Sequence, residues 1–168
     1  MQEPAATDKL LALINHLPAA VYNCAIHEDK LVLDFISDGF SDITGYPVEE
    51  VAAQKVEVYR RGVHPDDREQ LNCAIQRSLQ AREDFTIVYR ILHQNGSVKW
   101  VRENGRMYID TAGVAHLLGY VFDITAEQNA ADLLEANRQE LDLLSRAWIK
   151  IFSTVCLSSA LTNETNPL

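Results

Sequence analysis

The chain has 168 residues, of which 47% are hydrophobic, and this fits one compact domain of about 100 to 150 residues plus an appendage. Its 24 acidic residues outnumber 15 basic ones and give a net charge of −9, so nucleic acid is excluded as the expected direct partner. The three cysteines, Cys24, Cys73 and Cys156, are far apart and form no C-x-x-C pair. They predict neither a disulfide framework nor a thiolate metal site.

Neither end of the sequence carries a membrane signal. Residues 1–4 contain no basic stretch leading into an apolar core, so we expect no secretory signal. The most apolar segment, residues 147–161, is too short and too polar to span a bilayer core of about 30 Å. We therefore expect a cytoplasmic location and no membrane span.

The first third of the chain predicts a helix, two strands and a second helix. Residues 10–17 place apolar side chains at helical spacing and Pro18 ends the pattern, so residues 1–18 should form an amphipathic flanking helix. Residues 20–26 and 31–36 are β-prone and flank a short polar break, which predicts an antiparallel hairpin. Ser37 is predicted to cap a short helix that Gly45 ends with a left-handed backbone.

Further helices and three strands follow. Pro47 with the acids after it predicts a short helical turn, and residues 65–79 predict a longer amphipathic helix. Residues 85–93, 98–109 and 114–124 predict strands, with Asn95-Gly96 expected to form a type I′ hairpin turn. Both faces of these strands are apolar. One face should therefore cover the short helices, and the N-terminal helix or another subunit should cover the other.

Two strands, several small helices and three strands make an α+β fold. The order and the local motifs resemble a PAS domain, of the subgroup with a His-Pro-Asp-Asp helix start. The matching stretches are FISDGF at 35–40, ITGYPVEEV at 43–51, VHPDDR at 63–68, YRI at 89–91, NGSVKWV at 95–101 and GYVFDIT at 119–125. The resemblance implies a five-stranded antiparallel sheet with short helices on one face, found as a sensor in bacterial two-component kinases and cyclic-di-GMP signalling proteins.

The resemblance also bears on cofactors. Haem-binding PAS domains usually carry an axial histidine on the long helix, whereas the inward positions here are Leu71 and Ile75, so haem is disfavoured. Flavin-binding ones carry a reactive cysteine in a Gly-x-Asn-Cys-Arg pattern, and residues 56–63 contain none, so a flavin adduct is disfavoured. The five histidines show no metal-ligand spacing, and no metal is predicted. The cofactor stays unknown.

A cavity between the sheet and the helices is the candidate ligand site. An apolar set of this kind is more often solid core than a pocket, because protein interiors are close-packed. Gly119 would leave room for a ligand, and a tyrosine would orient its polar edge. The candidate pocket residues are Phe40, Ile43, Tyr59, Leu71, Ile75, Tyr89, Ile91, Val101 and Val121.

The junction after the last strand is the candidate relay. Thr125 and Gln128 fit a capping box, and with Asp123 they form the signal junction that the resemblance implies. Residues 19–125 would thus be the sensor domain, residues 126–160 a signalling and dimerisation helix, and residues 161–168 a polar tail.

A heptad pattern in that helix predicts a coiled-coil seam. The seam residues are Leu134, Asn137, Leu141, Leu144, Trp148 and Ile151. The favoured interpretation is a homodimer whose register Asn137 fixes, with parallel and antiparallel arrangements both open. The alternative is that the helix packs back on its own domain.

The sequence contains no nucleophile elbow, no phosphate-binding glycine loop and no kinase signature. We therefore expect no enzymatic activity, and any kinase or cyclase output would lie outside this chain. The predicted function is a sensory module that binds a small molecule or a partner and transmits its state through a dimeric helix. The alternative is a ligand-free dimerisation or protein-interaction scaffold.

Overall fold

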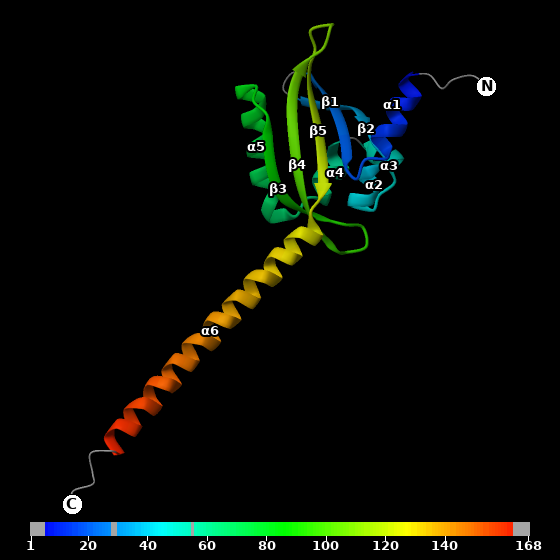
Figure 1. Cartoon of the computed structure of the whole chain (residues 1–168). Helices are drawn as coiled ribbons and strands as arrows, with labels where there is room; N and C mark the ends of the chain where they lie inside the picture. Colours follow the sequence, from blue (N-terminus) through cyan, green and yellow to red (C-terminus); the bar gives the residue numbers. More distant parts are fainter. Residues whose placement is uncertain (1–5, 28–29, 55, 163–168) are drawn as a thin grey trace, which may run out of the picture. The chain divides into compact units, whose positions relative to one another are not determined.

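The computed structural model describes residues 6–27, 30–54 and 56–162. The chain divides into two units, with the boundary after Thr125. The first unit holds a β-sheet and its helices, and the second holds the long helix α6 (Thr125–Thr162) (Figure 1). The predicted tail, residues 161–168, lies mostly outside the described residues.

The sheet has five antiparallel strands, as predicted. They are β1 (Ala20–His27), β2 (Lys30–Ile36), β3 (Phe85–Leu92), β4 (Val98–Ile109) and β5 (Ala115–Asp123). Their spatial order is β2-β1-β5-β4-β3, so the first and last strands of the domain lie side by side at the centre. This order places the end of β5, and hence the exit to α6, next to β4.

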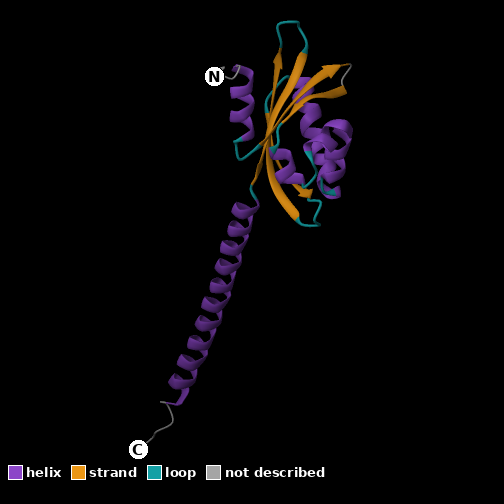
Figure 2. Cartoon of the chain, turned by 90° about the vertical axis from the view of Figure 1, so that its right-hand side faces the viewer, coloured by secondary structure: helices purple, strands orange, loops and turns teal. Residues whose placement is uncertain are grey.

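The helices lie on both sides of the sheet (Figure 2). On one face are α2 (Gly39–Thr44), α3 (Val48–Gln54), α4 (Val56–Gly62) and α5 (Arg68–Ala81). The predicted N-terminal helix is α1 (Ala6–Asn15), on the opposite side. Helix α5 begins at Arg68, three residues later than predicted, because Pro65–Asp67 form a separate 3-10 turn.

Local turn chemistry differs from the prediction at two places. Ser37 does not cap α2; its buried hydroxyl instead accepts a hydrogen bond from the Val21 backbone N–H at 2.8 Å. The prediction of a type I′ turn was also wrong. Such a turn needs a positive φ at both central residues, and here Gly96 has a φ of 86° while the φ of Asn95 is not positive. The Gly96 N–H donates to the His93 carbonyl, so a turn followed by one left-handed glycine closes this hairpin.

Alternation along the strands separates two faces, as predicted. The inner face is buried under α2–α5 and includes Ile87, Ile91, Leu117 and Val121. The outer face keeps large side chains partly exposed, among them Val88, Leu118 and Tyr120. Since α1 leaves these residues exposed, covering by another subunit stays a prediction.

An ion pair fixes the start of α5 to β3. The Asp67 carboxylate accepts the Arg90 backbone N–H and Nε at 2.8 Å each, and an Arg90 terminal nitrogen at 2.6 Å. The Arg90 guanidinium also lies over the Trp100 ring, 5.5 Å from its centroid. These bonds hold the pKa of Asp67 below its ordinary value. The second acid of the His-Pro-Asp-Asp start therefore has a structural role.

We expect Asp67→Asn to lower the free energy of unfolding by about 1–3 kcal/mol, because it weakens charge-assisted bonds around a side chain that is only 13% exposed. Asp66→Asn is the matched control, since its side chain is 71% exposed and its change should stay within about 0.5 kcal/mol. Urea denaturation measures both. Because the pKa of Asp67 is lowered, its contribution should be lost as the pH falls below the ordinary value of 3.8. Equal losses in the two variants would contradict this role.

Candidate functional site

A buried carboxyl group stands on the inner face of β4. Glu103 is 2% exposed, and both of its oxygens accept hydrogen bonds from phenols. Tyr22 on β1 donates to Oε1 at 2.5 Å, and Tyr89 on β3 donates to Oε2 at 2.6 Å. The Tyr89 hydroxyl also bonds the hydroxyl of Tyr59 on α4. We call these four residues the Glu103 cluster; it joins three strands and one helix.

Glycine at position 119 makes the cluster sterically feasible. Tyr22 pairs with Gly119 across β1 and β5, and its ring must cross β5 to reach Glu103 on β4. A Cβ atom on Gly119 would lie 2.2 Å from the Tyr22 ring, a distance that real Cβ atoms do not adopt. Gly105, the partner of Gly119 on β4, leaves the same kind of space for the Phe85 ring. The two glycines thus leave room for the rings of Tyr22 and Phe85 on the inner face of the sheet.

Burial controls the ionisation of the cluster. Removal from water raises the pKa of Glu103 from 4.5 to about 7, while the hydrogen bond from Tyr22 acts in the opposite direction. Burial, followed by the nearby Glu103 charge, raises the pKa of both Tyr22 and Tyr59 well above its ordinary value. Near neutral pH, Glu103 therefore changes its charge while the phenols of Tyr22 and Tyr59 keep their protons.

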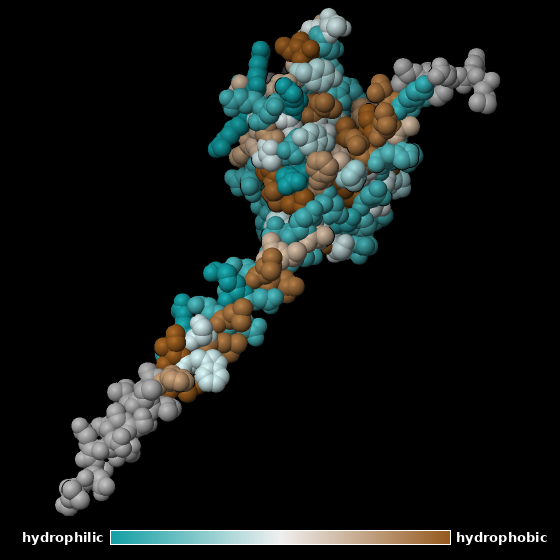
Figure 3. Space-filling model, in the orientation of Figure 1, coloured by the Kyte–Doolittle hydropathy of each residue, from teal (hydrophilic) through white to brown (hydrophobic). Residues whose placement is uncertain are grey.

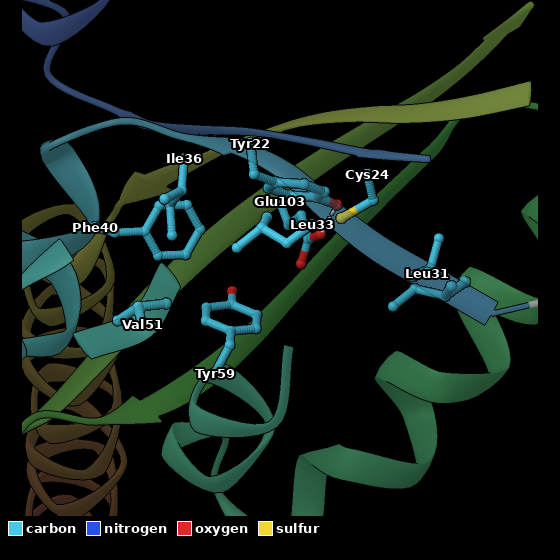
Figure 4. A pocket seen from close by; sticks show the side chains of 10 residues that line it. Tyr22, Cys24, Leu31, Leu33, Ile36, Phe40, Val51, Tyr59 and Glu103 are labelled. Carbon is cyan, nitrogen blue, oxygen red and sulfur yellow. Dashed lines mark hydrogen bonds between the residues drawn. The ribbon is translucent and has the colours of Figure 1, made fainter. Parts of the chain in front are cut away.

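A small cavity adjoins the cluster (Figure 4). Its volume is about 60 Å³. One water needs about 10–15 Å³, and pockets for drug-sized ligands measure about 300–1,000 Å³, so this cavity admits only a small guest. Its walls are otherwise apolar, and the lining residues are Tyr22, Cys24, Leu31, Leu33, Ile36, Phe40, Val51, Tyr59, Ile75 and Glu103.

The pocket candidates from the sequence fall into two groups. Phe40, Tyr59 and Ile75 line the cavity, and Tyr89 lies behind it as a donor to Glu103. The others, Ile43, Leu71, Ile91, Val101 and Val121, are buried in the surrounding core.

Sequence reasoning missed Tyr22 and Glu103, which supply most of the site's polarity. A signal for Glu103 was present. It occupies an inward position of an alternating strand, between Val101 and Gly105, where an acid is out of place unless it is bonded.

At the signal junction, Thr125 is tied to β4. Its hydroxyl accepts the Trp100 backbone N–H at 3.0 Å and donates to an Asp123 oxygen at 2.5 Å. The Ile124 N–H donates to the Trp100 carbonyl at 2.8 Å. The other Asp123 oxygen lies 3.1 Å from Lys99 Nζ. The last residues before α6 are therefore fixed to the beginning of β4.

The predicted capping box is not what the structure contains. Asp123 accepts the Thr125 backbone N–H at 3.0 Å, which is the bond assigned to Gln128 in a capping box. The Gln128 amide instead donates to Asp132 at 3.1 Å, one turn along α6. The prediction was wrong because β4 supplies a competing backbone donor for the Thr125 hydroxyl.

Helix α6 presents its heptad positions to solvent. Leu134 is 71% exposed and Leu141 is 67% exposed, and the space-filling view shows hydrophobic residues along this helix (Figure 3). The other predicted seam residues, Asn137, Leu144, Trp148 and Ile151, are exposed as well. Ion pairs join Glu135 to Arg138 and Asp142 to Arg146, outside the seam positions. The coiled coil itself stays a prediction.

In the part of the chain that the structure describes, no group of three or more His, Cys, Asp and Glu side chains is placed to hold a metal ion. The two ring nitrogens of His116 lie 3.3 Å from an Asp34 oxygen and 3.1 Å from an Asp110 oxygen. None of the described helices is both long and apolar enough to cross a membrane.

Comparison with known proteins gives one family match. The family model described as "PAS fold" matches residues 33–121. The chain is 26% identical, over 115 residues, to the methyl sulfide methyltransferase-associated sensor of Methanosarcina acetivorans, covering 67% of this chain and 11% of that protein. It is 25% identical, over 141 residues, to the two-component sensor PprA of Pseudomonas aeruginosa, covering 83% of this chain and 15% of that protein.

Solved structures agree with this match. The N-terminal domain of a diguanylate cyclase with PAS/PAC sensor from Marinobacter aquaeolei is 27% identical, with a TM-score of 0.55, and the match covers 66% of this chain and 98% of that one. A sensory box histidine kinase/response regulator from Burkholderia thailandensis, 22% identical with a TM-score of 0.59, shares the fold over 79% of this chain and 97% of that one. The chain spans only 11% to 16% of the curated relatives it matches.

We expect the stability of the protein to fall as the pH rises through the pKa of Glu103, because the folded state holds this proton more tightly than the unfolded one. The stabilisation is complete below the ordinary pKa of 4.5 and is lost above about 7. The shift corresponds to about 3 kcal/mol.

Glu103→Gln keeps the shape of the side chain but cannot ionise. The difference in unfolding free energy between wild type and variant should therefore change by about 3 kcal/mol between about pH 4 and about pH 8. Urea titrations of both proteins across this range provide the measurement. Parallel pH profiles would show that Glu103 is not the buried titrating group.

Proposed function

The chain belongs to the PAS fold family, and on that premise we propose that it is the sensory module of a signal-transduction protein. The input would be received by the cavity beside the Glu103 cluster, and the output would pass through a dimeric α6. The names of the relatives support this role, since a methyltransferase-associated sensor, a two-component sensor and the sensor protein FixL are among them. In this proposal the protein is cytoplasmic and itself carries no catalytic activity.

Strand β4 connects the Glu103 cluster to the start of α6. Its inner face holds Glu103, and three residues earlier the Trp100 backbone holds Thr125 at the start of α6. A change in the hydrogen bonds of the cluster would move the strand to which Thr125 is attached. A ligand or proton that binds one arrangement of the cluster better than the other would then shift the population of two α6 arrangements.

The exposed heptad positions of α6 support a homodimer. An isolated helix buries none of its apolar stripe, whereas pairing would remove several leucines from water at about 1.5–3 kcal/mol for each fully buried side chain. Asn137 would fix the register as a polar seam residue. The catalytic output, a kinase or a cyclase, would belong to another domain, in keeping with the small share of each relative that this chain spans.

A second candidate function is a ligand-free dimerisation scaffold. The small cavity volume of about 60 Å³ favours it. So does the full pairing of buried polar side-chain atoms in the described part of the chain, which leaves no group that requires a ligand. Native mass spectrometry of the purified protein separates the candidates. A retained small molecule supports the sensor, and its absence combined with an input-insensitive dimer supports the scaffold.

We expect Leu141→Asp to weaken the dimer by about a hundredfold or more, because it places two carboxylates in an apolar seam. Leu143→Asp is the matched control, since Leu143 is equally exposed, at 68%, but lies outside the seam. Its dissociation constant should stay close to that of the wild type. Sedimentation velocity over a micromolar concentration series measures all three proteins. A monomeric wild type, or equal weakening by both variants, would contradict the seam.

The sensory role is tested by coupling between the Glu103 cluster and α6. If the two are linked, the dimer dissociation constant should change by about fivefold or more between about pH 6 and about pH 8. Glu103→Gln should remove this dependence, and so should Thr125→Val, which breaks the bond to Trp100.

Thr86→Val is the control for the coupling test. It makes the same chemical change on β3, where the Thr86 hydroxyl donates to Asn104 on the exposed surface. This variant should keep the pH dependence of the wild type. A dimer that does not respond to pH, or one that responds equally in Thr125→Val, would argue for the scaffold.

A further inference from the structure

One end of the cavity is polar, and the hydroxyl hydrogens of the Glu103 cluster at this end can be assigned one by one. Apart from Glu103, the polar groups that line the cavity are the phenols of Tyr22 and Tyr59 and the thiol of Cys24, which is only a weak donor. Tyr89 lies behind them and links Tyr59 to Glu103. This cavity is the input site of the proposed sensory function, and the binding proposed below therefore rests on that function.

With Glu103 ionised, the hydrogen bonds of the cluster form a closed set. Tyr22 and Tyr89 each donate their only hydroxyl hydrogen to the carboxylate. Tyr59 donates its own to the Tyr89 oxygen. Every hydroxyl hydrogen is used, and the cavity is left without a hydrogen-bond donor from the cluster.

With Glu103 protonated, the cluster contains one hydrogen too many. A proton on Oε2 must point at Tyr89, which then turns its hydrogen toward Tyr59, and Tyr59 must turn its hydrogen elsewhere. A proton on Oε1 displaces the hydrogen of Tyr22 in the same way. Both routes end at a phenol that lines the cavity. An unpaired buried donor is costly, so this hydrogen favours an acceptor in the cavity.

We propose that the cavity binds a small neutral molecule with an apolar body and one hydrogen-bond acceptor, such as a carbonyl oxygen, and that binding is coupled to uptake of one proton by Glu103. The apolar walls from β2, α3 and α5 accommodate the body of the guest. The volume of about 60 Å³ limits it to a few non-hydrogen atoms. The guest and the proton then stabilise each other.

The groups that face Glu103 permit this coupling. Tyr22 and Cys24 approach from β1, Tyr89 from β3 and Tyr59 from α4. Burial and the Glu103 charge hold the pKa of Tyr22 and of Tyr59 well above neutrality, and burial raises the pKa of Cys24 to about 12. Tyr22, Tyr59 and Cys24 keep their protons near neutral pH, while the pKa of Glu103 is about 7. Glu103 is therefore the group that takes up the proton.

Acetone and isobutene are matched probes, because they have the same shape and only acetone has an acceptor oxygen. Binding of each to the full chain is followed by NMR of the methyl groups of Leu31, Leu33 and Ile75, which line the cavity. Acetone affinity should fall about tenfold between about pH 6 and about pH 8, and isobutene affinity should stay unchanged. Calorimetry of acetone binding in two buffers of different ionisation enthalpy should show proton uptake near pH 8.

Glu103→Gln should bind acetone with an affinity that no longer depends on pH; should this variant not fold, the calorimetric proton uptake of the wild type decides alone. Acetone binding without pH dependence or proton uptake would overturn the inference, yet it would leave the cavity as an input site. Failure of both probes to shift the three methyl groups would overturn the inference and also remove the cavity from the proposed function. Retention of the coupling in the variant would equally overturn it.

Discussion

The fold depends on keeping one carboxyl group satisfied inside an apolar sheet. A buried acid without partners destabilises a protein strongly, and Glu103 avoids this because Tyr22 and Tyr89 donate to its two oxygens. These donors come from strands on either side of β4 in the spatial order, and Tyr59 adds a helix. The register of four elements is thereby fixed around a single side chain. Such an arrangement favours one well-defined packing over an apolar core that several packings would fill.

Strand β4, which carries Glu103, is also linked to the starts of α5 and α6 through other residues. Trp100 on β4 makes both links. Its backbone N–H donates to Thr125 at the start of α6, and its ring lies under the Arg90 guanidinium, which binds Asp67 before α5. The start of α5, the start of α6 and the Glu103 cluster are therefore attached to one continuous stretch of chain. In the proposed sensor, this stretch of β4 would connect the interior of the domain to α6.

Much of the fold could be predicted from the sequence, because strand alternation and left-handed glycines are local signals. Gly45 and the five strands are examples. The errors at Ser37 and Thr125 share one cause, since a backbone N–H from another strand bonds a hydroxyl that local rules assigned to a helix cap. The strand pattern could have marked Glu103 as a buried acid, but it could not have identified the partners of this residue. Tyr22 and Glu103 are 81 positions apart, and only the sheet register brings them together.

The absent side chain at position 119 has a consequence for how this domain can diverge. The Tyr22 ring occupies the space that any larger residue 119 would need, so the two positions cannot vary independently. A lineage that acquires alanine at 119 must shrink residue 22 at about the same time, and it then loses a donor to Glu103. Glu103 would then be a buried acid with one donor missing, which destabilises the fold and favours an apolar residue at this position. Positions 119, 22 and 103 are therefore linked, the first two by steric contact and the last two by a hydrogen bond.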